Sequence, residues 1–369
     1  MDKTRVMIFN KTGRHMRRNF YLGDEKVKTT REYKYLGFKF TPSSEITSGL
    51  SDLKDRAMKA FYKIKRKMGP SFQTFPLLTL KLFDTLIKPI LLYGSDFWGI
   101  LKLPKNNPFE ILHLQCCKQV LGVQKQTTNI GVLLELGQIP LHHYAVKNGL
   151  KNWVRLTTQQ NGNEITLKSH EFARENNLKS IACVQDTLSR IGLMEDFITK
   201  NKKHTHINAW QRLNDIFHQL AFTEIKKENS KLRTYGLLKT NIGFENYLHA
   251  DINLRDRIAL TKLRLSNHEL MIEKGRHTKI DKNKRFCPFC PKIIETELHF
   301  LLHCNTFSHL RMVVFEKTMK ENPNFIFLQD TEKFILLLTK QNLINHTANF
   351  LKKGFECRSF LLGKYKYPV

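Results

Sequence analysis

The segment CPFCPKIIETELHFLLHC contains four residues with the types and spacing of metal ligands. Cys287, Cys290, His299 and Cys304 follow the pattern C-x2-C-x8-H-x4-C. Two cysteines separated by two residues form a tight turn that presents both thiolates to one ion, and a histidine with a third thiolate completes the tetrahedral set that zinc prefers. The segment therefore predicts a closed, structural zinc site, whose ion contributes on the order of 10 kcal/mol to folding.

The fourth ligand has two candidates. On an unbroken α-helix His299 and Cys304 lie about 140° apart around the axis, whereas His299 and His303 share a face. Cys304 is the ligand only if the helix ends there and a second helix starts after Asn305, a residue type that favours helix N-caps. His303 is therefore the alternative, and a third interpretation is that the cysteines are small buried residues without an ion.

The charged residues of the chain are strongly unbalanced. In 369 residues, 61 lysines and arginines stand against 33 aspartates and glutamates, a formal net charge of +28. The excess is spread along the chain, with aromatic residues between the cations. RNA and/or DNA is therefore favoured over a membrane surface as the partner, and no membrane partner is expected.

Cysteine usage and the N-terminus predict a reducing compartment. Seven cysteines are ordinary usage for this length, and Lys3 and Arg5 interrupt any apolar signal segment. The protein is therefore expected to be intracellular, in the nucleus and/or the cytoplasm. The most apolar stretch, LLTLKLFDTLIKPILLYG, contains charges and a proline, which predicts a buried helix rather than a membrane span.

Common catalytic signatures are missing from the sequence. It has no Walker loop, no GxSxG, no HExxH and no adjacent pair of aspartates. Two-metal nucleotidyl transfer therefore lacks its obvious carboxylate cluster, and no catalytic residue is predicted.

The elements expected in the first 42 residues are strands. The apolar run at 6–9 predicts a strand buried on both faces. The dipeptide Gly23-Asp24 lies between the strand-like segments FYL and EKVKT and predicts a hairpin. The string YKYLGFKF places aromatic residues on both sides of Gly37, a pattern that fits a core strand.

The next segment has a helical period. Apolar residues recur every three or four positions, which predicts one amphipathic helix at 48–68 that ends near Gly69-Pro70. Basic residues occupy its other faces, and we expect them to contact a phosphate backbone; a solvated charged face is the alternative. If about six phosphates are neutralised, affinity falls about a thousandfold between roughly 50 and 200 mM salt. These basic residues are Lys54, Arg56, Lys59, Lys63, Lys65, Arg66 and Lys67.

The remainder of the chain is expected to be almost entirely α-helical. Two segments, 158–180 and the basic 273–285, are predicted to be linkers or loops. The predicted fold class is mainly α, a multi-segment helical protein with a small N-terminal antiparallel β element and a small zinc-knuckle domain. The further helices are expected at about 76–92, 106–120, 129–136, 141–156, 182–199, 206–228 and 251–272.

Several segments, taken in order, resemble the C-terminal part of the reverse transcriptase polyprotein of non-LTR, LINE-like retrotransposons. They cover nearly the whole chain, and their joint order is more specific than any one segment. The segments are KTRVMIFNKTGR, REYKYLGFKFTPS, LFDTLIKPILLYGSDFWG, CCKQVLGVQKQTTNIGVLLELGQIPL, SKLRTYGLLKTNIGFENYLH and CPFC…ETELHFLLHC…LR.

The resemblance implies a role for each part of the chain. KTRVMIFN corresponds to the palm strand that follows the family's metal-binding turn. EYKYLGFKF resembles the primer-grip hairpin, with Tyr35, Leu36 and Gly37 as nucleic-acid contacts. The implied domains are a distal palm remnant with this hairpin at 1–45, a helical thumb-like domain at 46–157, a helical connector at 158–272, and a basic loop with a CCHC zinc knuckle at 273–369.

The resemblance also implies which site residues carry over. The family's four zinc ligands match the cysteine-histidine pattern, although Asn305 stands where the family often has proline. No position matches the polymerase carboxylates, so Mg²⁺ is expected only in a complete polymerase whose other segments lie upstream. The further nucleic-acid candidates, all in the basic loop, are Lys282, Lys284 and Arg285.

Three functions follow from these observations. The main hypothesis is a truncated reverse transcriptase that binds template-primer and RNA without polymerase activity of its own. The first alternative is a free-standing nucleic-acid-binding or structural adaptor. The second is a mis-split part of a complete RNA-directed DNA polymerase, which an in-frame ADD turn upstream of Met1 would favour.

Overall fold

The computed structural model describes residues 4–10, 12–16, 18–43, 45–103, 107–158, 164–199, 204–227 and 230–363. As the sequence predicts, these residues are mainly α-helical, with short strands near the N-terminus. The chain forms two compact units. Unit 1 contains Met1–Gly69, Lys81–His113 and Pro140–Ile216, and unit 2 contains Pro70–Leu80, Leu114–Ile139 and Phe217–Val369. The division into four successive domains stays a prediction.

Three short strands form the first sheet of unit 1. They are β1 (Arg5–Val6), β2 (Phe20–Leu22) and β3 (Glu25–Thr29), in the order β1-β3-β2. The expected hairpin is confirmed: β2 and β3 are antiparallel around Gly23-Asp24, and Gly23 has the positive φ of 61° that this tight turn needs. β1 runs parallel to β3, so the sheet is mixed.

The apolar run at 6–9 is not the buried strand that the sequence predicts. Only Val6 of this run lies in β1, and Phe9 is 52% exposed. Among the described residues β1 pairs only with β3, so it is an edge strand. The prediction of burial on both faces is therefore wrong for this structure.

A second hairpin packs on the basic helix. It consists of β4 (Tyr33–Tyr35) and β5 (Phe38–Phe40), and both residues of its turn have positive φ, 45° at Leu36 and 85° at Gly37. Positive φ at both positions is typical of a two-residue type I′ turn. Phe38 is buried and faces Gly49, where a Cβ would lie 2.2 Å from the phenyl ring. The helix and the hairpin can approach this closely only because residue 49 is glycine.

The predicted amphipathic helix is confirmed as α1 (Thr47–Met68). Its apolar face is buried at Leu50, Leu53, Ala57 and Phe61, in the three-to-four-residue period read from the sequence. The helix ends at Gly69, which has a φ of 52°.

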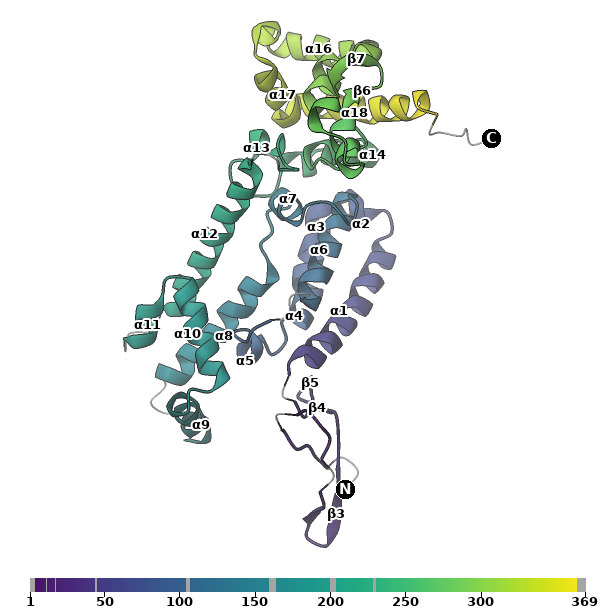
Figure 1. Cartoon of the computed structure of the whole chain (residues 1–369). Coiled ribbons are helices and arrows are strands. Elements are labelled where there is room, and N and C mark those ends of the chain that lie inside the picture. The colour runs from purple at the N-terminus through teal and green to yellow at the C-terminus, as the bar shows by residue number, and fades with distance from the viewer. Residues whose placement is uncertain are drawn as a thin grey trace. The chain divides into compact units, whose positions relative to one another are not determined.

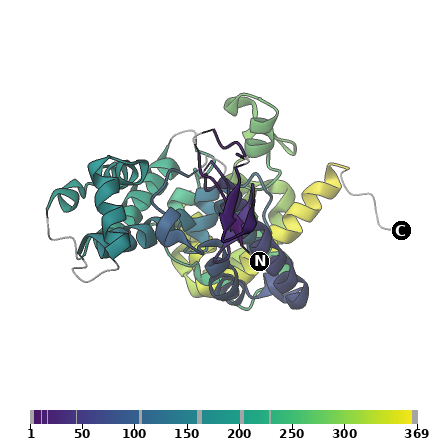
Figure 2. The same cartoon turned by 90° about the horizontal axis from the view of Figure 1, so that it is seen from below.

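The other helices associated with unit 1 follow the expected order. α8, α10 and the first part of α12 share a core that includes Leu150, Trp153, Val184 and Leu188, and Figures 1 and 2 show these helices grouped together. Three of the five boundaries between the units fall within helices, in α3, α6 and α12. The helical segments are α3 (Pro76–Leu82), the π-helical η1 (Phe83–Ile87), α4 (Lys88–Leu91), α5 (Ser95–Trp98), α6 (Pro108–Leu121), α8 (Leu141–Thr158), α9 (Glu164–Glu175), α10 (Lys179–Arg190), α11 (Met194–Ile198) and α12 (Thr205–Lys226).

Two details of unit 1 differ from the prediction. The segment 158–180 contains the helix α9, although residues 159–163 lie outside the described part. None of the described side chains of α9 is buried, so the apolar signal that predicts a helix is weak there. The helix expected at 182–199 is interrupted at Gly192, whose φ of 70° breaks it into α10 and α11.

Unit 2 is built around its last long helix. α18 (Gln341–Leu361) packs against α14, α16 and α17, as Figure 1 shows. Large side chains such as Phe300, Phe334 and Phe350 are buried in this core. The other elements are α2 (Ser71–Thr74), α7 (Asn129–Glu135), α13 (Tyr235–Leu238), η2 (Asn246–Leu248), α14 (Leu254–Arg264), α15 (Met271–His277), η3 (Lys282–Lys284), β6 (Phe286–Cys287), β7 (Cys290–Ile294), η4 (His299–His303), η5 (Asn305–Phe307), α16 (Ser308–Glu321), η6 (Pro323–Phe327) and α17 (Asp330–Thr339).

The middle of unit 2 also differs from the predicted secondary structure. The helix expected at 251–272 is interrupted after α14, where Ser266 has a positive φ of 49°. The expected basic loop at 273–285 is only partly a loop, because α15 extends to His277 and η3 forms a short turn. In the part of the chain that the structure describes, no helix has the length and apolar content needed to cross a membrane.

Candidate metal centre and basic surfaces

The four predicted metal ligands lie together in unit 2. Their ligand atoms are all within 4.8 Å of one another, and the four residues are buried. The antiparallel pair β6–β7 supplies Cys287 and Cys290, which face each other across its turn. The segment that follows supplies His299 and Cys304. This arrangement can hold a metal ion between a hairpin and a helical turn.

A π-helical turn explains how His299 and Cys304 meet despite their five-residue spacing. In η4 the Cys304 N–H donates to the His299 carbonyl at 2.8 Å, the i to i+5 bond of a π-helix. The wider turn brings residues five apart close together, whereas an α-helix separates them. The chain leaves the helical conformation at Cys304 and resumes α-helix at Ser308, so the predicted break is present.

The alternative ligand, His303, points elsewhere. Its Nε2 lies 2.6 Å from Oδ2 of Asp330, and its side chain is 51% exposed. His303 and Cys304 are neighbours on this turn, but their side chains point in different directions. Cys304 belongs to the buried group and His303 does not. Cys304 is therefore the fourth member of the cluster.

The electrostatics of the cluster suit a cation. The Cys304 Sγ lies 4.0 Å from Sγ of Cys287 and 3.8 Å from Sγ of Cys290. The hydrogen bond with Cys304, together with burial, raises the pKa of Cys287 to about 12, whereas the same hydrogen bond lowers the pKa of Cys304. Nε2 of His299 is buried and makes no hydrogen bond to another described residue. Three crowded thiols and an unpartnered imidazole nitrogen fit a soft or borderline metal ion.

Arg311 of α16 fixes the turn that carries Cys304. Its guanidinium group is buried and donates to the carbonyl oxygens of Leu301 at 2.8 Å, Phe300 at 3.2 Å and Cys304 at 2.8 Å. These carbonyl groups end the π-helical turn and would otherwise lack partners. The arginine therefore supports the ligand position from outside the ligand set.

Two buried glutamates tie the segment between hairpin and turn to the rest of unit 2. Glu295 accepts two hydrogen bonds of 2.7 Å from the guanidinium group of Arg358. Glu297 pairs with Arg233 and lies 3.0 Å from Nε2 of His268. Burial alone would raise the pKa of Glu297, but His268 and Arg233 lower it. No local sequence pattern identifies either glutamate, because their partners are distant in sequence.

A further buried polar cluster was also missed. Glu135 of α7 is fully buried and accepts hydrogen bonds from Tyr235 at 2.8 Å, Tyr247 at 2.7 Å and Nε of Arg264 at 2.7 Å. Arg264 also pairs with Glu245. The cluster joins two of the segments on which the family resemblance depends, VLLELGQIPL and SKLRTYGLLKTNIGFENYLH. Glu135, Tyr235, Tyr247 and Arg264 are all buried, so loss of one partner would leave an uncompensated charge inside the fold.

The basic residues of α1 divide into two groups. Lys59, Lys63, Arg66 and Lys67 are exposed, and among the described residues none of them has an ion-pair partner. Their spacing places them along one side of the helix, together with the half-exposed Tyr62. We call these four cations the α1 stripe. Lys54 and Lys65 are half-buried.

Arg56 belongs to the second group. It donates to the carbonyl oxygen of Gly37 at 2.7 Å, and its Nε lies 3.1 Å from Asp52. The side chain therefore joins α1 to the turn of the β4–β5 hairpin. At that turn Tyr35 is 57% exposed and Leu36 is 73% exposed, so both can contact a partner.

The three basic candidates near the metal centre also differ. Lys282 and Lys284 are exposed on η3. Arg285 is half-buried and donates to the carbonyl oxygens of Ile280 and Ile272, each at 2.9 Å. Its place in these backbone hydrogen bonds gives it a structural role.

Comparisons with protein-family models, curated proteins and solved structures found no match for this chain.

Proposed function

We propose that this chain binds nucleic acid in the manner of the thumb and C-terminal region of a non-LTR retrotransposon reverse transcriptase. The observation that carries the proposal is the α1 stripe, four exposed cations without ion-pair partners in the described part of the chain. Clustered cations on one face of a helix are the electrostatic feature that a phosphate backbone attracts, whereas a surface with balanced charges attracts it less. The formal charge of +28 supports the same partner.

The contact between α1 and the β4–β5 hairpin supports the resemblance. In the family the corresponding hairpin is expected to grip the primer next to the thumb. Here Arg56 and the pair Lys34–Asp52, 3.1 Å apart, hold the hairpin against α1. The exposed tip at Tyr35 and Leu36 and the α1 stripe would then contact the same duplex.

The metal is proposed to be zinc in a structural role. Three thiolates and one imidazole complete a tetrahedral set and leave no open position for a substrate. Bound zinc would link the β6–β7 hairpin to the π-helical turn. Such free thiols are stable in a reducing compartment, which fits the nucleus and/or the cytoplasm.

The proposed role is to hold template and primer and not to extend the primer. No residue of this chain matches the polymerase carboxylates of the family, and the sequence has no adjacent aspartates. A primer-extension assay with an RNA template, a DNA primer and Mg²⁺ tests this part. We expect binding without nucleotide incorporation, and incorporation by the purified chain would contradict this part of the proposal.

A matched pair of variants tests the binding surface. The stripe variant replaces Lys59, Lys63, Arg66 and Lys67 by glutamine. The control variant makes the same change at four other exposed cations of unit 1, Lys151, Lys168, Arg174 and Lys179.

Fluorescence anisotropy would measure the affinity of each variant for a labelled RNA–DNA template-primer. We expect the stripe variant to bind at least about tenfold more weakly than the control variant, because it loses direct phosphate contacts. Equal losses in the two variants would contradict a specific surface. Equal affinity of the wild type for template-primer and for single strands would favour the adaptor hypothesis over a primer grip.

A further inference from the structure

Unit 2 contains a cavity that neither the metal centre nor the α1 stripe explains. It has a volume of about 410 Å³, within the range of roughly 300–1,000 Å³ that is typical of small-molecule sites. Its wall combines lysine side chains, two histidines and one phenylalanine. We call this cavity the lysine pocket.

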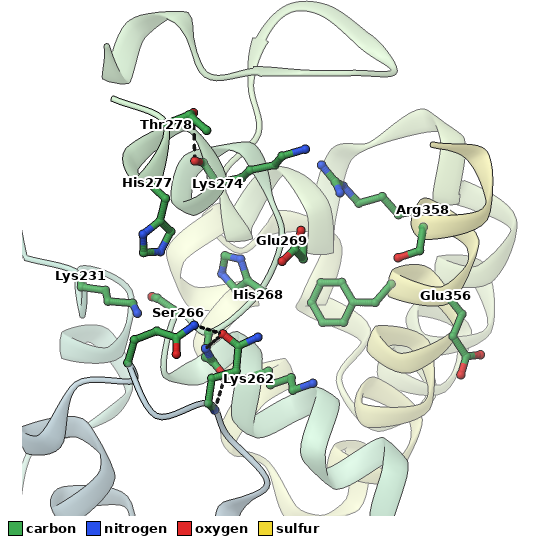
Figure 3. Close-up of a pocket in the computed structure, with 15 residues that line it drawn as sticks. Lys231, Lys262, Ser266, His268, Glu269, Lys274, His277, Thr278, Glu356 and Arg358 are labelled. Carbon is green, nitrogen blue, oxygen red and sulfur yellow. Dashed lines mark hydrogen bonds between the residues drawn. The ribbon is translucent and has the colours of Figure 1, made fainter. Parts of the chain in front are cut away.

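Three lysines approach the lysine pocket from separate elements. Lys231 precedes α13, Lys262 lies on α14 and Lys274 lies on α15, and Figure 3 shows them on different sides of the cavity. None of the three forms an ion pair with another described residue. The wall also contains Arg358, but its charge is already balanced by Glu295. The three ammonium groups are therefore the cations that remain for a ligand.

The positive charge around Lys231 is incompletely balanced. Lys231 and Lys262 are half-buried. Burial is the main cause that lowers the pKa of Lys231, and the charges of Arg276 and Arg233 lower it further, against the attraction of Glu273. The charge of Lys231 in turn lowers the pKa of Lys118, after the larger effect of burial. An anion bound among these lysines would relieve this repulsion.

The remaining wall suits an aromatic ring. Phe355 of α18 lines the cavity and is held in place by stacking on Phe300, with ring centroids 4.9 Å apart and an interplanar angle of 7°. The ring of His268, also in the wall, lies 6.3 Å from Phe355. Rigid aromatic side chains near cations are the combination on which nucleotide bases stack.

We propose that the lysine pocket binds a single nucleotide, with its phosphate group among Lys231, Lys262 and Lys274 and its base against Phe355. The nucleotide is either free or the 5′-phosphorylated end of a nucleic-acid strand. This proposal deepens the nucleic-acid-binding function proposed above and rests on it where the nucleotide belongs to a strand. The wall also contains two carboxylates, Glu269 and Glu356. Their negative charges would repel further phosphate groups, so the cavity favours a ligand with a single phosphate group.

The test compares two charge-matched variants of the full chain. The pocket variant carries Lys231→Gln, Lys262→Gln and Lys274→Gln. The control carries Lys317→Gln, Lys320→Gln and Lys353→Gln, three exposed lysines of unit 2 outside the cavity. A single Lys262→Gln variant serves if the triple pocket variant does not fold by circular dichroism.

Titration calorimetry would measure the affinity of each protein for AMP. Fluorescence anisotropy would measure its affinity for a short single strand that carries either a 5′-phosphate or a 5′-hydroxyl. We expect the pocket variant to bind AMP, the 5′-phosphorylated strand or both at least about tenfold more weakly than the wild type, since the loss of even one charge-assisted hydrogen bond costs about that factor. The control should stay within about twofold. If the pocket variant loses affinity only for AMP, the ligand of the pocket is a free nucleotide. If it loses affinity only for the 5′-phosphorylated strand, the ligand is the 5′ end of a strand.

Two results would overturn the proposal. One is a wild type that neither binds AMP nor distinguishes the 5′-phosphate from the 5′-hydroxyl, and the other is equal weakening in the pocket and control variants. The stripe variant separates this proposal from the broader one. If the wild type binds AMP but no template-primer, the nucleic-acid-binding function fails while the pocket stands; if it binds template-primer through the α1 stripe but not AMP or a 5′-phosphate, only the pocket fails.

Discussion

At the scale of single residues, the candidate metal centre depends on which side chain of the π-helical turn points inward. Cys304 lies 3.8 Å from Cys290 in the buried cluster, whereas His303, its neighbour, pairs with Asp330 at the surface. Both residues have ligand chemistry, and only the geometry of η4 distinguishes them. The two positions are therefore suited to a direct comparison.

We expect Cys304→Ser to lose bound metal and His303→Ala to keep it. The serine variant should fall from about one zinc per chain toward none and should unfold more easily, because a structural zinc contributes several kcal/mol, on the order of 10 kcal/mol in small domains. The alanine variant loses only an exposed ion pair, worth about 1 kcal/mol or less. Metal analysis by mass spectrometry and thermal unfolding would measure both effects. Loss of zinc in His303→Ala with retention in Cys304→Ser would reverse the assignment.

The residue Glu110 gives a prediction for acid stability. Its Oε1 accepts a 2.7 Å hydrogen bond from the His142 backbone and lies 3.1 Å from Nδ1 of the same residue. Burial by itself would raise the pKa of Glu110, but His113 and His142 outweigh burial and lower it from 4.5 to about 2. As the pH falls, the unfolded chain therefore takes up a proton before the folded chain does.

We therefore expect the free energy of unfolding to fall between about pH 5 and pH 2, by on the order of 3 kcal/mol from this group. The Glu110→Gln variant cannot take up that proton, so its unfolding free energy should depend less on pH in this range. Urea unfolding at a series of pH values would measure the difference between the two proteins. Parallel pH profiles would show that Glu110 does not contribute in this way.

At the scale of elements, the basic helix and the β4–β5 hairpin form one joint element. Gly49 makes their contact possible, because a Cβ there would lie 2.2 Å from the ring of Phe38 and 2.9 Å from the Lys39 carbonyl oxygen. Phe38 is only 4% exposed and cannot move aside without opening the core. The close packing of the hairpin on the helix thus depends on the absence of a Cβ atom at Gly49.

We expect Gly49→Ala to destabilise the protein by about 1–3 kcal/mol through overpacking. Helix propensity alone predicts the opposite sign, since alanine favours a helix over glycine by about 1 kcal/mol. Ser51→Ala, at an exposed position of the same helix, is the control and should change little. Denaturant unfolding would measure both variants. A Gly49→Ala protein as stable as the wild type would mean that the hairpin does not pack here.

The elements also show why some features could be predicted from the sequence and others could not. The helix at 48–68 was predictable because its buried residues, Leu50 to Phe61, repeat at the helical period. The hairpin at Gly23-Asp24 was predictable from turn chemistry alone. α9 was missed because it buries none of its described side chains, and the edge position of β1 depends on which strands pair with it.

The candidate metal site was predictable in its members but not in its geometry. The cysteine and histidine spacing identified all four residues, yet an α-helical model of the segment left Cys304 and His303 as rivals. A π-helical turn has no clear sequence signal, and here it is stabilised by Arg311, seven positions after Cys304. The buried pairs Glu135–Arg264 and Glu295–Arg358 join residues 129 and 63 positions apart, so no local pattern could predict them.

At the scale of the whole molecule, the charge distribution is the feature that the proposed function must explain. Buried arginines such as Arg264, Arg311 and Arg358 are satisfied by carboxylates or carbonyl groups inside the fold. The cations of the α1 stripe have no such internal role among the described contacts. Part of the net charge of +28 therefore lies on exposed cations that can contact a polyanion.

The dependence of template-primer affinity on salt tests the central claim most directly. The account predicts that the logarithm of the wild-type association constant falls linearly with the logarithm of the salt concentration, and that the stripe variant reduces this slope by about three to four, since each phosphate contact contributes about 0.9. The control variant should keep the wild-type slope. Wild-type binding that does not respond to salt, or equal slopes in the stripe and control variants, would contradict the account.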